Sequence, residues 1–342
     1  MKPLRFAILG TGFWSRYQLA AWRELKGATC VALYNRTRAK AEKLGREFGI
    51  TAIYDDPAEL LQHERLDFVD IITDVATHAP LAQLAAKHGT AVICQKPMAT
   101  SLREAASMVR FCAARRTPLL IHENFRWQTP IRALAAQLGQ GTVGRPFRAR
   151  IDFISGFPVF ENQPFLAELE QFILTDMGSH SLDVVRFLFG EVKSLNCRTQ
   201  RIHKRIKGED AATVLMEMRN GMTVTVNLAY AGNALEREAF PETLMFVECE
   251  KGSVELAPGC DLRITTSLGT TTRRALPPKY SWADPRYAVV HSSMVPCQTN
   301  LLRALQGRGT AETTGSDNLR TVRLVFAAYK SAASVQTVSI PE

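Results

Sequence analysis

The tripeptide Gln95-Lys96-Pro97 places a lysine at the end of a short apolar run, Ala91 to Cys94. Ligands of open α/β sheets bind beyond the carboxyl ends of the strands, so a lysine at this place can act on a bound substrate. Pro97 fixes its own backbone and favours an extended Lys96, which ends the strand here. An exposed lysine before a loop proline is the simpler interpretation of the tripeptide taken alone, and the rest of the sequence decides between the two.

A glycine turn, Gly10-Thr11-Gly12, follows the first predicted strand and opens the first predicted helix. Gly10 permits the tight turn, and Gly12 lets a pyrophosphate approach the backbone at the helix N-terminus. Ser15 stands where the dinucleotide-binding fingerprint has its third glycine, and it is small enough for the helix to pack closely on the strand. The turn therefore predicts a dinucleotide site.

The second predicted strand ends in Asn35-Arg36, where the residue that reads the adenosine ribose is expected. A carboxylate there would bind the 2′-hydroxyl and repel a 2′-phosphate, and this chain has none. On charge alone NADP is accepted, and NAD also fits because Arg36 can stack on adenine while Asn35 hydrogen-bonds the ribose. The alternative is that Arg36 only packs at the start of the next helix.

Asp176 and His180 lie four residues apart at the start of a predicted helix and are therefore neighbours on one face. The carboxylate can orient the imidazole and stabilise its protonated form. Oxidation of a hydroxyl needs such a base, which takes the O–H proton while hydride leaves the same carbon. The alternative makes Asp176 an N-cap and His180 a buried structural side chain, but the glycine turn favours the base.

Strands and helices alternate through the first third of the chain, which predicts a parallel sheet covered by helices on both faces. The predicted strands are Arg5–Leu9, Val31–Tyr34, Phe68–Thr73, Ala91–Cys94 and Pro118–His122. The predicted helices run from the glycine turn to Leu25 and over Thr37–Phe48, Thr77–His88 and Ser101–Arg115, the last opened by a capping box. His78 and His122, at a helix start and a strand end, are assigned capping or ribose contacts.

The pattern changes after about residue 123, where strand-like stretches predict a large open, mostly antiparallel sheet. These stretches are Phe147–Ile154, Thr213–Met218, Met222–Leu228, Thr243–Glu248 and Asp261–Thr266. We therefore predict an α/β chain with a Rossmann-type doubly wound domain at residues 1–122. Residues 123–342 form an α+β domain for substrate binding and oligomerisation.

Composition narrows the class of protein. The 342 residues fit two domains, and 46% hydrophobic with 22% charged residues is typical of a folded globular protein. No apolar run is long enough to span a membrane, and Met1–Arg5 lead into a strand without a signal-peptide core, so a cytoplasmic protein without a membrane partner is expected. Seven scattered cysteines without a Cys-x-x-Cys predict reduced thiols and no metal site.

The net charge of +9 is mostly dispersed, with one dense stretch at residues 201–207. No aromatic residues interleave with that stretch, so a solvated hairpin or loop is predicted there rather than a nucleic-acid site.

The glycine turn, the Lys-Pro about eighty-five residues later and the Asp-x-x-x-His on a later helix resemble the Gfo/Idh/MocA family of sugar and polyol dehydrogenases. The likeness spans essentially the whole chain. In that family the tripeptide is usually Glu-Lys-Pro, its lysine contacts the reacting hydroxyl, and the Asp-x-x-x-His pair supplies the base and its partner. The resemblance thus implies that Lys96 binds the hydroxyl, His180 is the base and Asp176 orients it; Gln95 replaces the usual glutamate.

The resemblance also implies the residues around the cofactor and the substrate. The expected cofactor contacts are Gly10, Gly12, Phe13, Trp14, Asn35, Arg36, Thr73, His78, Gln95, Lys96, Asn124 and Trp127. The expected substrate contacts are Lys96, Asn162, Gln163, Asp176 and His180. No metal ligands are expected. Within the family, residues 155–165 and 34–37 are similar to the subgroup that oxidises the branched aldopentose D-apiose to its lactone with NAD.

The predicted reaction is NAD(P)-dependent oxidation of a small aldose, D-apiose as the best guess, at its anomeric carbon. Oxidation of a cyclitol or another secondary alcohol is the alternative within enzymes. A non-catalytic sensor of NAD(P) is the alternative outside them, although a sensor has no need of a proton path. An open sheet with one uncovered face predicts a homo-oligomer, either a dimer or a tetramer.

Overall fold

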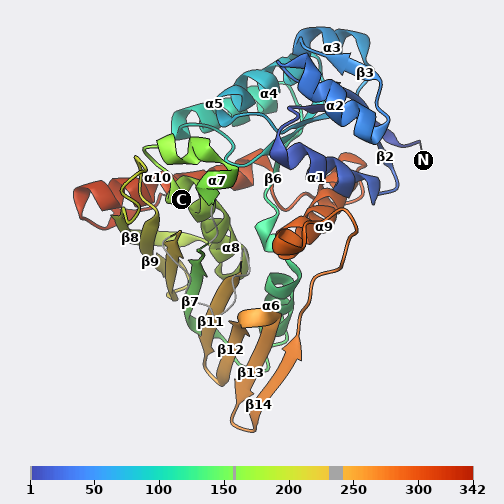
Figure 1. Cartoon of the computed structure of the whole chain (residues 1–342). Helices are drawn as coiled ribbons and strands as arrows, with labels where there is room; N and C mark the ends of the chain where they lie inside the picture. The colour runs from blue at the N-terminus through green and yellow to red at the C-terminus, as the bar shows by residue number, and fades with distance from the viewer. Residues whose placement is uncertain (1, 157–158, 231–241, 342) are drawn as a thin grey trace. The chain divides into compact units, whose positions relative to one another are not determined.

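The computed structural model describes residues 2–156, 159–230 and 242–341, except for the side chain of Asn162 (Figure 1). The chain divides into two compact units. The first comprises Met1–Glu123, Ser281–Ala283 and Met294–Val322, and the second comprises Asn124–Tyr280, Asp284–Ser293 and Arg323–Glu342. The return of residues 294–322 to the first unit is a feature that the predicted division after residue 122 does not include.

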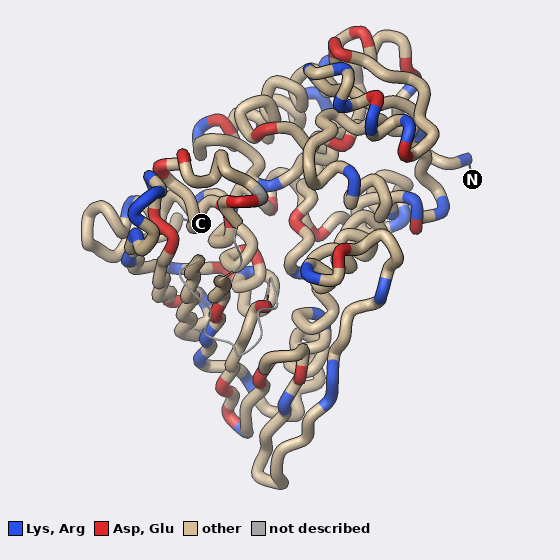
Figure 2. The backbone as a smooth tube through the Cα atoms, in the orientation of Figure 1, with Lys and Arg blue, Asp and Glu red and all other residues tan. Residues whose placement is uncertain are grey.

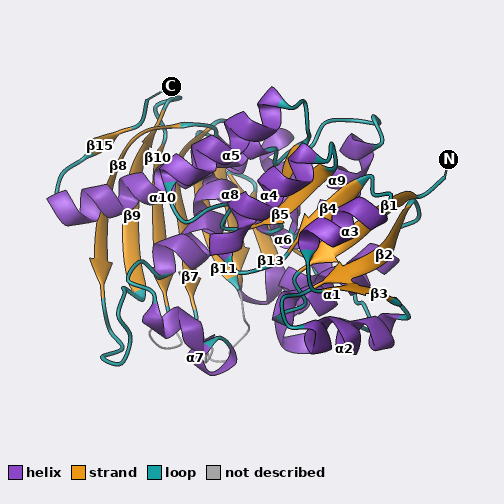
Figure 3. Ribbon diagram, turned by 90° about the horizontal axis from the view of Figure 1, so that it is seen from above, coloured by secondary structure: helices purple, strands orange, loops and turns teal. Residues whose placement is uncertain are grey.

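The first unit contains a parallel sheet of six strands among the described residues, in the order β3-β2-β1-β4-β5-β6 (Figure 3). The strands are β1 Leu4–Leu9, β2 Ala28–Tyr34, β3 Ala52–Tyr54, β4 Phe68–Ile71, β5 Ala91–Gln95 and β6 Leu119–His122. The helices are α1 Phe13–Arg23, α2 Arg38–Phe48, α3 Pro57–His63, α4 His78–Lys87 and α5 Leu102–Ala114. The predicted Rossmann-type sheet is confirmed, with β3 and α3 in addition.

Local sequence signals explain where these helices begin and end. Ser101 accepts a hydrogen bond from the backbone N–H of Glu104 at 3.2 Å, so the predicted cap opens α5. Asp56 caps α3 through the N–H of Ala58 at 2.7 Å. Gly49 ends α2 with φ +65°, a left-handed conformation that favours glycine.

Continuous apolar runs fill the first sheet because helices cover both of its faces. Every residue of β4 is buried, and Phe6 of β1 stacks on Phe68 with ring centroids 4.7 Å apart. The ring of Trp22 from α1 lies 5.1 Å from that of Phe6, so α1 packs directly on the sheet. This packing fixes the glycine turn that precedes α1.

The second unit contains a sheet with the strand order β14-β13-β12-β11-β7-β10-β9-β8-β15 among the described residues (Figure 3). Its strands are β7 Pro146–Ile154, β8 Val192–Gln200, β9 Ala211–Met218, β10 Thr223–Ala229, β11 Thr243–Cys249, β12 Gly252–Ala257, β13 Asp261–Thr266, β14 Gly269–Arg274 and β15 Val338–Ser339. Among the described strands of this sheet, only the pair β7–β10 is parallel, so the predicted mostly antiparallel sheet is confirmed.

Burial alternates along β9, where Ala212, Val214 and Met216 are buried and Leu215 is 49% exposed. One face of this strand therefore packs on a core and the other does not. The remaining α-helices of the described residues are α6 Thr129–Gly139, α7 Val159–Asn162, α8 Ser179–Phe189, α9 Ala288–Leu305 and α10 Gly315–Ser334; the last two have residues in both units. Of these, α8 lies against β10.

The basic stretch at residues 201–207 is a loop that joins the antiparallel strands β8 and β9, as predicted. Lysines, arginines and carboxylates are dispersed along the rest of the backbone (Figure 2). No helix in the described part of the chain is both long enough and apolar enough to cross a membrane.

Candidate active site

The glycine turn of the first unit is shaped by close backbone packing. Gly10 has φ +103°, and a Cβ built on it would lie 2.6 Å from the carbonyl oxygen of Ile72. Gly12 is the N-cap of α1, and no atom of the described residues lies within 4 Å of a Cβ built there. Gly10 is thus required by the fold, whereas Gly12 leaves open space in front of the helix N-terminus.

Neighbouring side chains support the same turn. The carboxamide oxygen of Asn35 accepts a hydrogen bond from the N–H of Thr11 at 3.1 Å, and the hydroxyl of Ser15 donates to the carbonyl of Gly12 at 2.6 Å. Arg36 is exposed. Phe13, 43% exposed, meets Trp14 edge to face with ring centroids 5.4 Å apart. These residues gather where the sequence predicts the cofactor contacts.

Thr73 and His78 follow β4 and form a small polar cluster. The ring of His78 is 1% exposed, and its Nε2 lies 3.0 Å from the carbonyl oxygen of Thr73. Its Nδ1 lies 3.0 Å from the carbonyl oxygen of Pro97. Burial lowers the pKa of His78, although the two carbonyl contacts act in the opposite direction. The side chain therefore joins the loop after β4 to the loop after β5.

Lys96 follows the last residue of β5 and is half-buried, and the Lys96–Pro97 peptide bond is cis. Its backbone N–H donates to the carboxamide oxygen of Gln95 at 2.8 Å. The amide nitrogen of Gln95 donates to Gln18 of α1 at 2.9 Å. Both ends of the Gln95 side chain are therefore engaged within the first unit.

Asp176 and His180 lie on consecutive turns in the second unit. A π-helical turn, Leu174–Gly178, runs into α8, which Gly178 caps. Asp176 is inside the π-helical turn and half-buried, so the alternative that made it the N-cap is wrong. His180 is buried, 4% exposed. Single π-helical turns are frequent at functional sites because they change which side chains share a helix face.

Two residues that the sequence did not indicate hold the start of the π-helical turn. The Glu209 carboxylate accepts from the backbone N–H groups of Phe172 and Leu174 at 3.3 and 3.2 Å. The Tyr329 hydroxyl donates to Glu209 at 2.7 Å and accepts from the N–H of Thr175 at 3.2 Å. They satisfy the N–H groups that a helix start leaves without intrahelical partners.

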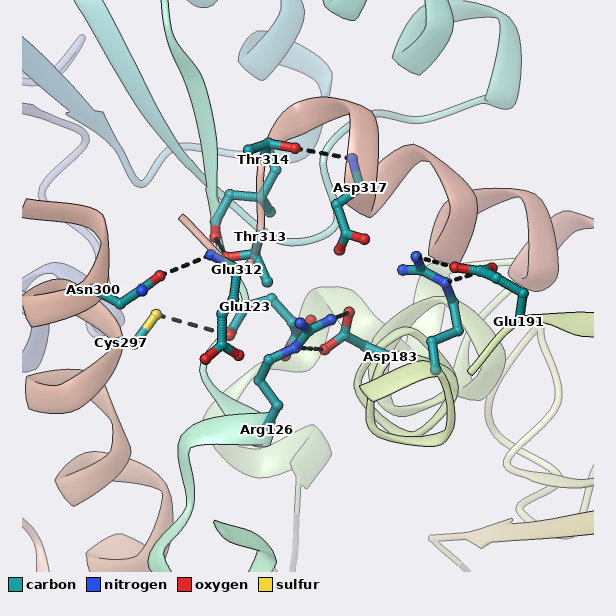
Figure 4. Close-up of polar contacts among 12 residues, drawn as sticks. Glu123, Arg126, Asp183, Glu191, Cys297, Asn300, Glu312, Thr313, Thr314 and Asp317 are labelled. Atoms are coloured by element: carbon teal, nitrogen blue, oxygen red, sulfur yellow. Dashed lines mark hydrogen bonds and ion pairs between the residues drawn. The ribbon is translucent and has the colours of Figure 1, made fainter. Parts of the chain in front are cut away.

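The 3₁₀ turn Phe125–Trp127 is joined to α8 in two ways. The ring of Phe125 stacks on the His180 imidazole with centroids 3.8 Å apart and planes 11° apart. The guanidinium of Arg126 forms a two-bond ion pair with Asp183, with Nε–Oδ2 2.8 Å and Nη2–Oδ1 2.7 Å (Figure 4). The ring of Phe125 thus covers one face of the His180 imidazole, and the ion pair holds the 3₁₀ turn that carries Phe125 to α8.

The other predicted cofactor and substrate contacts lie in different local structures. The Asn124 amide donates to the Ser293 hydroxyl at 2.8 Å and to the carbonyl of Val290 at 3.3 Å, so it anchors the 3₁₀ turn to α9. The ring of Trp127 lies under the Arg132 guanidinium, 3.6 Å from its centroid. Gln163 precedes a 3₁₀ turn, Pro164–Glu168. The Asn162 side chain lies outside the described residues, as do Phe157 and Pro158.

Tyr230 is a further residue of this region that the sequence did not indicate. Its side chain is buried, and its ring packs on Phe153 and Phe172. Burial raises the pKa of its hydroxyl well above the ordinary value, and the Asp176 carboxylate acts in the same direction. Its position at the end of β10, beside a helix that carries Asp176, becomes evident only when the sheet is assembled.

The glycine turn fits a dinucleotide pyrophosphate. The N-terminus of α1 has no side-chain cap, and the Oγ1 of Thr11 is buried without a hydrogen-bond partner in the described structure. Backbone N–H groups of a helix start and a small turn residue are what a phosphate group binds.

Two protein-family models match most of the chain. Residues 4–122 match the oxidoreductase family Gfo/Idh/MocA, NAD-binding Rossmann fold, and residues 131–255 match the Gfo/Idh/MocA C-terminal domain. The chain belongs to the Gfo/Idh/MocA oxidoreductase family. The family resemblance that the motifs indicated is thereby confirmed. The predictions of an NAD-dependent dehydrogenase and of an NAD-binding first domain are confirmed as well.

Two curated relatives and one solved structure cover nearly the whole chain. A D-apiose dehydrogenase of Rhizobium rhizogenes is 44% identical over 99% of this chain and 98% of its own. Another from Paraburkholderia graminis is 42% identical over 99% and 90%. An oxidoreductase from Agrobacterium radiobacter, solved with NAD+, L-tartaric acid and magnesium, superposes with a TM-score of 0.96 at 43% identity, covering 99% of this chain and 98% of that one.

Proposed function

We propose that this protein oxidises a small aldose, D-apiose first among them, at the anomeric carbon to the lactone with NAD. The observation that carries the substrate is the pair of full-length relatives named D-apiose dehydrogenase, at 44% and 42% identity. The residues that carry the chemistry are Lys96 at the end of β5 and the Asp176–His180 pair at the start of α8.

In the proposed reaction, His180 accepts the proton of the anomeric hydroxyl as the C–H bond breaks. The nicotinamide, when bound, accepts the hydride of that bond. Asp176 stabilises the imidazolium that forms, and Lys96 donates a hydrogen bond to the oxygen that becomes the lactone carbonyl. The stacked ring of Phe125 supports this role because it limits rotation of the imidazole. Asn162 and Gln163 are proposed to bind the other hydroxyls.

The cofactor contacts of the proposal are those at the glycine turn and at Thr73, His78, Gln95, Lys96, Asn124 and Trp127. Arg36 is exposed at the end of the second strand, which supports acceptance of NADP beside NAD. Arg36→Ala should raise the KM for NADP more than the KM for NAD. Strict rejection of NADP by the unchanged protein would end this argument.

The proposal is tested by a reduction assay over aldoses and inositol with NAD and NADP in parallel. His180→Ala should lower kcat at saturating sugar by about a hundredfold or more, because that is what a general base contributes. The matched control is His88→Ala, an exposed histidine at the end of α4, which should keep normal turnover. Near-normal turnover of His180→Ala, or turnover of inositol alone, would reject the proposal.

We further propose that the protein is cytoplasmic and forms a homo-oligomer. Each subunit would contain the domains 1–122 and 123–342. Light scattering of the purified protein distinguishes a dimer from a tetramer.

A further inference from the structure

A chain of side-chain hydrogen bonds leads from a buried carboxylate to the backbone of Lys96. The amide nitrogen of Gln18 lies 2.8 Å from both carboxylate oxygens of Asp70. The carboxamide oxygen of Gln18 accepts from Gln95 at 2.9 Å, and the carboxamide oxygen of Gln95 accepts from the N–H of Lys96 at 2.8 Å. We call the residues Asp70, Gln18 and Gln95 the amide relay.

Two of the three relay residues are fully buried, Gln95 is half-buried, and further contacts fix the buried pair. Asp70 and Gln18 are both 0% exposed. The indole N–H of Trp22 donates to Asp70 at 2.7 Å, and the carbonyl of Gln18 accepts from Gln298 at 2.9 Å. Unmatched polar groups at such depth are costly, so the members of a buried network must agree in donor and acceptor direction.

The carboxylate sets that direction. Burial raises the pKa of Asp70 to about 6, so the group is ionised at pH 8 and can only accept. Gln18 must then present its nitrogen to Asp70 and its oxygen to Gln95. Gln95 must in turn present its nitrogen to Gln18, which leaves its oxygen for Lys96. The two ends of the relay, a carboxylate and a backbone N–H, are compatible only with amides between them.

We propose that Asp70, acting through Gln18 and Gln95, positions the main chain of Lys96, and that this chain therefore requires an amide rather than a carboxylate at residue 95. Asp70 and Gln18 are positioning residues, since they act on Lys96 through Gln95. The catalytic consequence rests on the proposed function, in which Lys96 binds the oxygen being oxidised.

Single substitutions should break the relay in opposite ways. In Gln95→Glu the new carboxylate can only accept, so the Gln18 carboxamide must flip to donate to it. The carboxamide oxygen of Gln18 then faces the Asp70 carboxylate. Asp70→Asn offers a donor to Gln18, and the resulting reversal leaves the Lys96 N–H facing the nitrogen of Gln95. The double variant Gln95→Glu/Asp70→Asn reverses the whole relay, because the new amide at position 70 can donate to Gln18 and accept from Trp22.

The test is a double-mutant cycle with two measurements on the full-length protein. Hydrogen exchange of the Lys96 amide should accelerate about tenfold or more in Asp70→Asn, where the amide nitrogen of Gln95 faces that N–H. It should return to within about threefold of the unchanged protein in the double variant, where the carboxylate introduced at residue 95 accepts from it. In the sugar assay at pH 8, kcat should fall about tenfold in each single variant and should be higher in the double variant than in either single one.

Trp22→Phe is the control, because it removes one donor to Asp70 and leaves the relay direction intact. It should lower the melting temperature without accelerating exchange at Lys96. The proposal is overturned if exchange at Lys96 in the double variant stays as fast as in Asp70→Asn, or if Trp22→Phe accelerates exchange as much as Asp70→Asn does. It is also overturned if the melting temperature and kcat of Gln95→Glu match those of the unchanged protein. If the unchanged protein oxidises no sugar, the proposed function fails while the exchange cycle still decides on the relay.

Discussion

Asp183→Ala tests the ion pair that joins α8 to the 3₁₀ turn beside His180. The side chains of Arg126 and Asp183 are 6% and 0% exposed, and two hydrogen bonds of 2.8 and 2.7 Å connect them. Breaking a buried ion pair by removal of one partner costs about 3–5 kcal/mol. For a unit of this size each kcal/mol lowers the melting temperature by about 2–4 °C, so a loss of roughly 6–20 °C is expected.

The assay is thermal unfolding followed by calorimetry for three variants. Asp183→Ala should show the full loss, whereas the uncharged double variant Arg126→Met/Asp183→Leu should recover most of it, because it buries no lone charge. Glu255→Gln breaks an exposed pair with Arg263 on β12 and β13 and should leave the melting temperature unchanged. It is the matched control for loss of a carboxylate.

Two outcomes would refute this reasoning. One is a change below about 1 kcal/mol for Asp183→Ala, because the pair would then behave as an exposed one. The other is a double variant as unstable as the single variant, because the loss would then come from packing rather than from the charges of the pair.

Two further predictions concern the first unit. Gly10→Ala should destabilise the fold and weaken NAD binding, because its Cβ would lie 2.6 Å from the Ile72 carbonyl oxygen. Gly12→Ala should fold normally and only raise the KM for NAD. Melting temperatures and KM values distinguish the two variants, and equal losses of stability would contradict the prediction. Burial raises the pKa of Asp70 from 3.8 to about 6, so the carboxyl group holds its proton more tightly in the native state than in the unfolded state. Its contribution to the free energy of unfolding should therefore fall by roughly 3 kcal/mol as pH rises from about 4 to about 6. Asp70→Asn should remove that dependence in unfolding curves at pH 4.5 and 7, and equal pH slopes would speak against it.

Most of the first sheet could be predicted from sequence because its strands are buried on both faces and read as apolar runs. The strand β3, Ala52–Tyr54, is too short to give such a run. The helix α3 does carry a sequence signal, with Asp56 as the cap and Pro57 at its first position.

The second sheet was harder to predict because many of its strands carry polar residues on an open face. Every residue of β14, Gly269–Arg274, is exposed, so no hydrophobic alternation marks it. The helix α9 contains Pro296, which argues against a helix when only the sequence is available. The π-helical turn at Leu174–Gly178 has no sequence signature, since Glu209 and Tyr329 that hold it are distant in the chain.

Lys96 illustrates how far a motif carries the prediction of a site. Strand order predicted the place of Lys96, but its support comes from Gln18, Asp70 and Gln95, which no spacing connects. They meet because β1 pairs with β4 and β4 with β5, while α1 packs on the strands that it follows. Topology thus assembles the amide relay, and donor and acceptor direction decides which residue types it accepts. A glutamine at residue 95 therefore follows from the buried carboxylate at residue 70 rather than from the chemistry of Lys96.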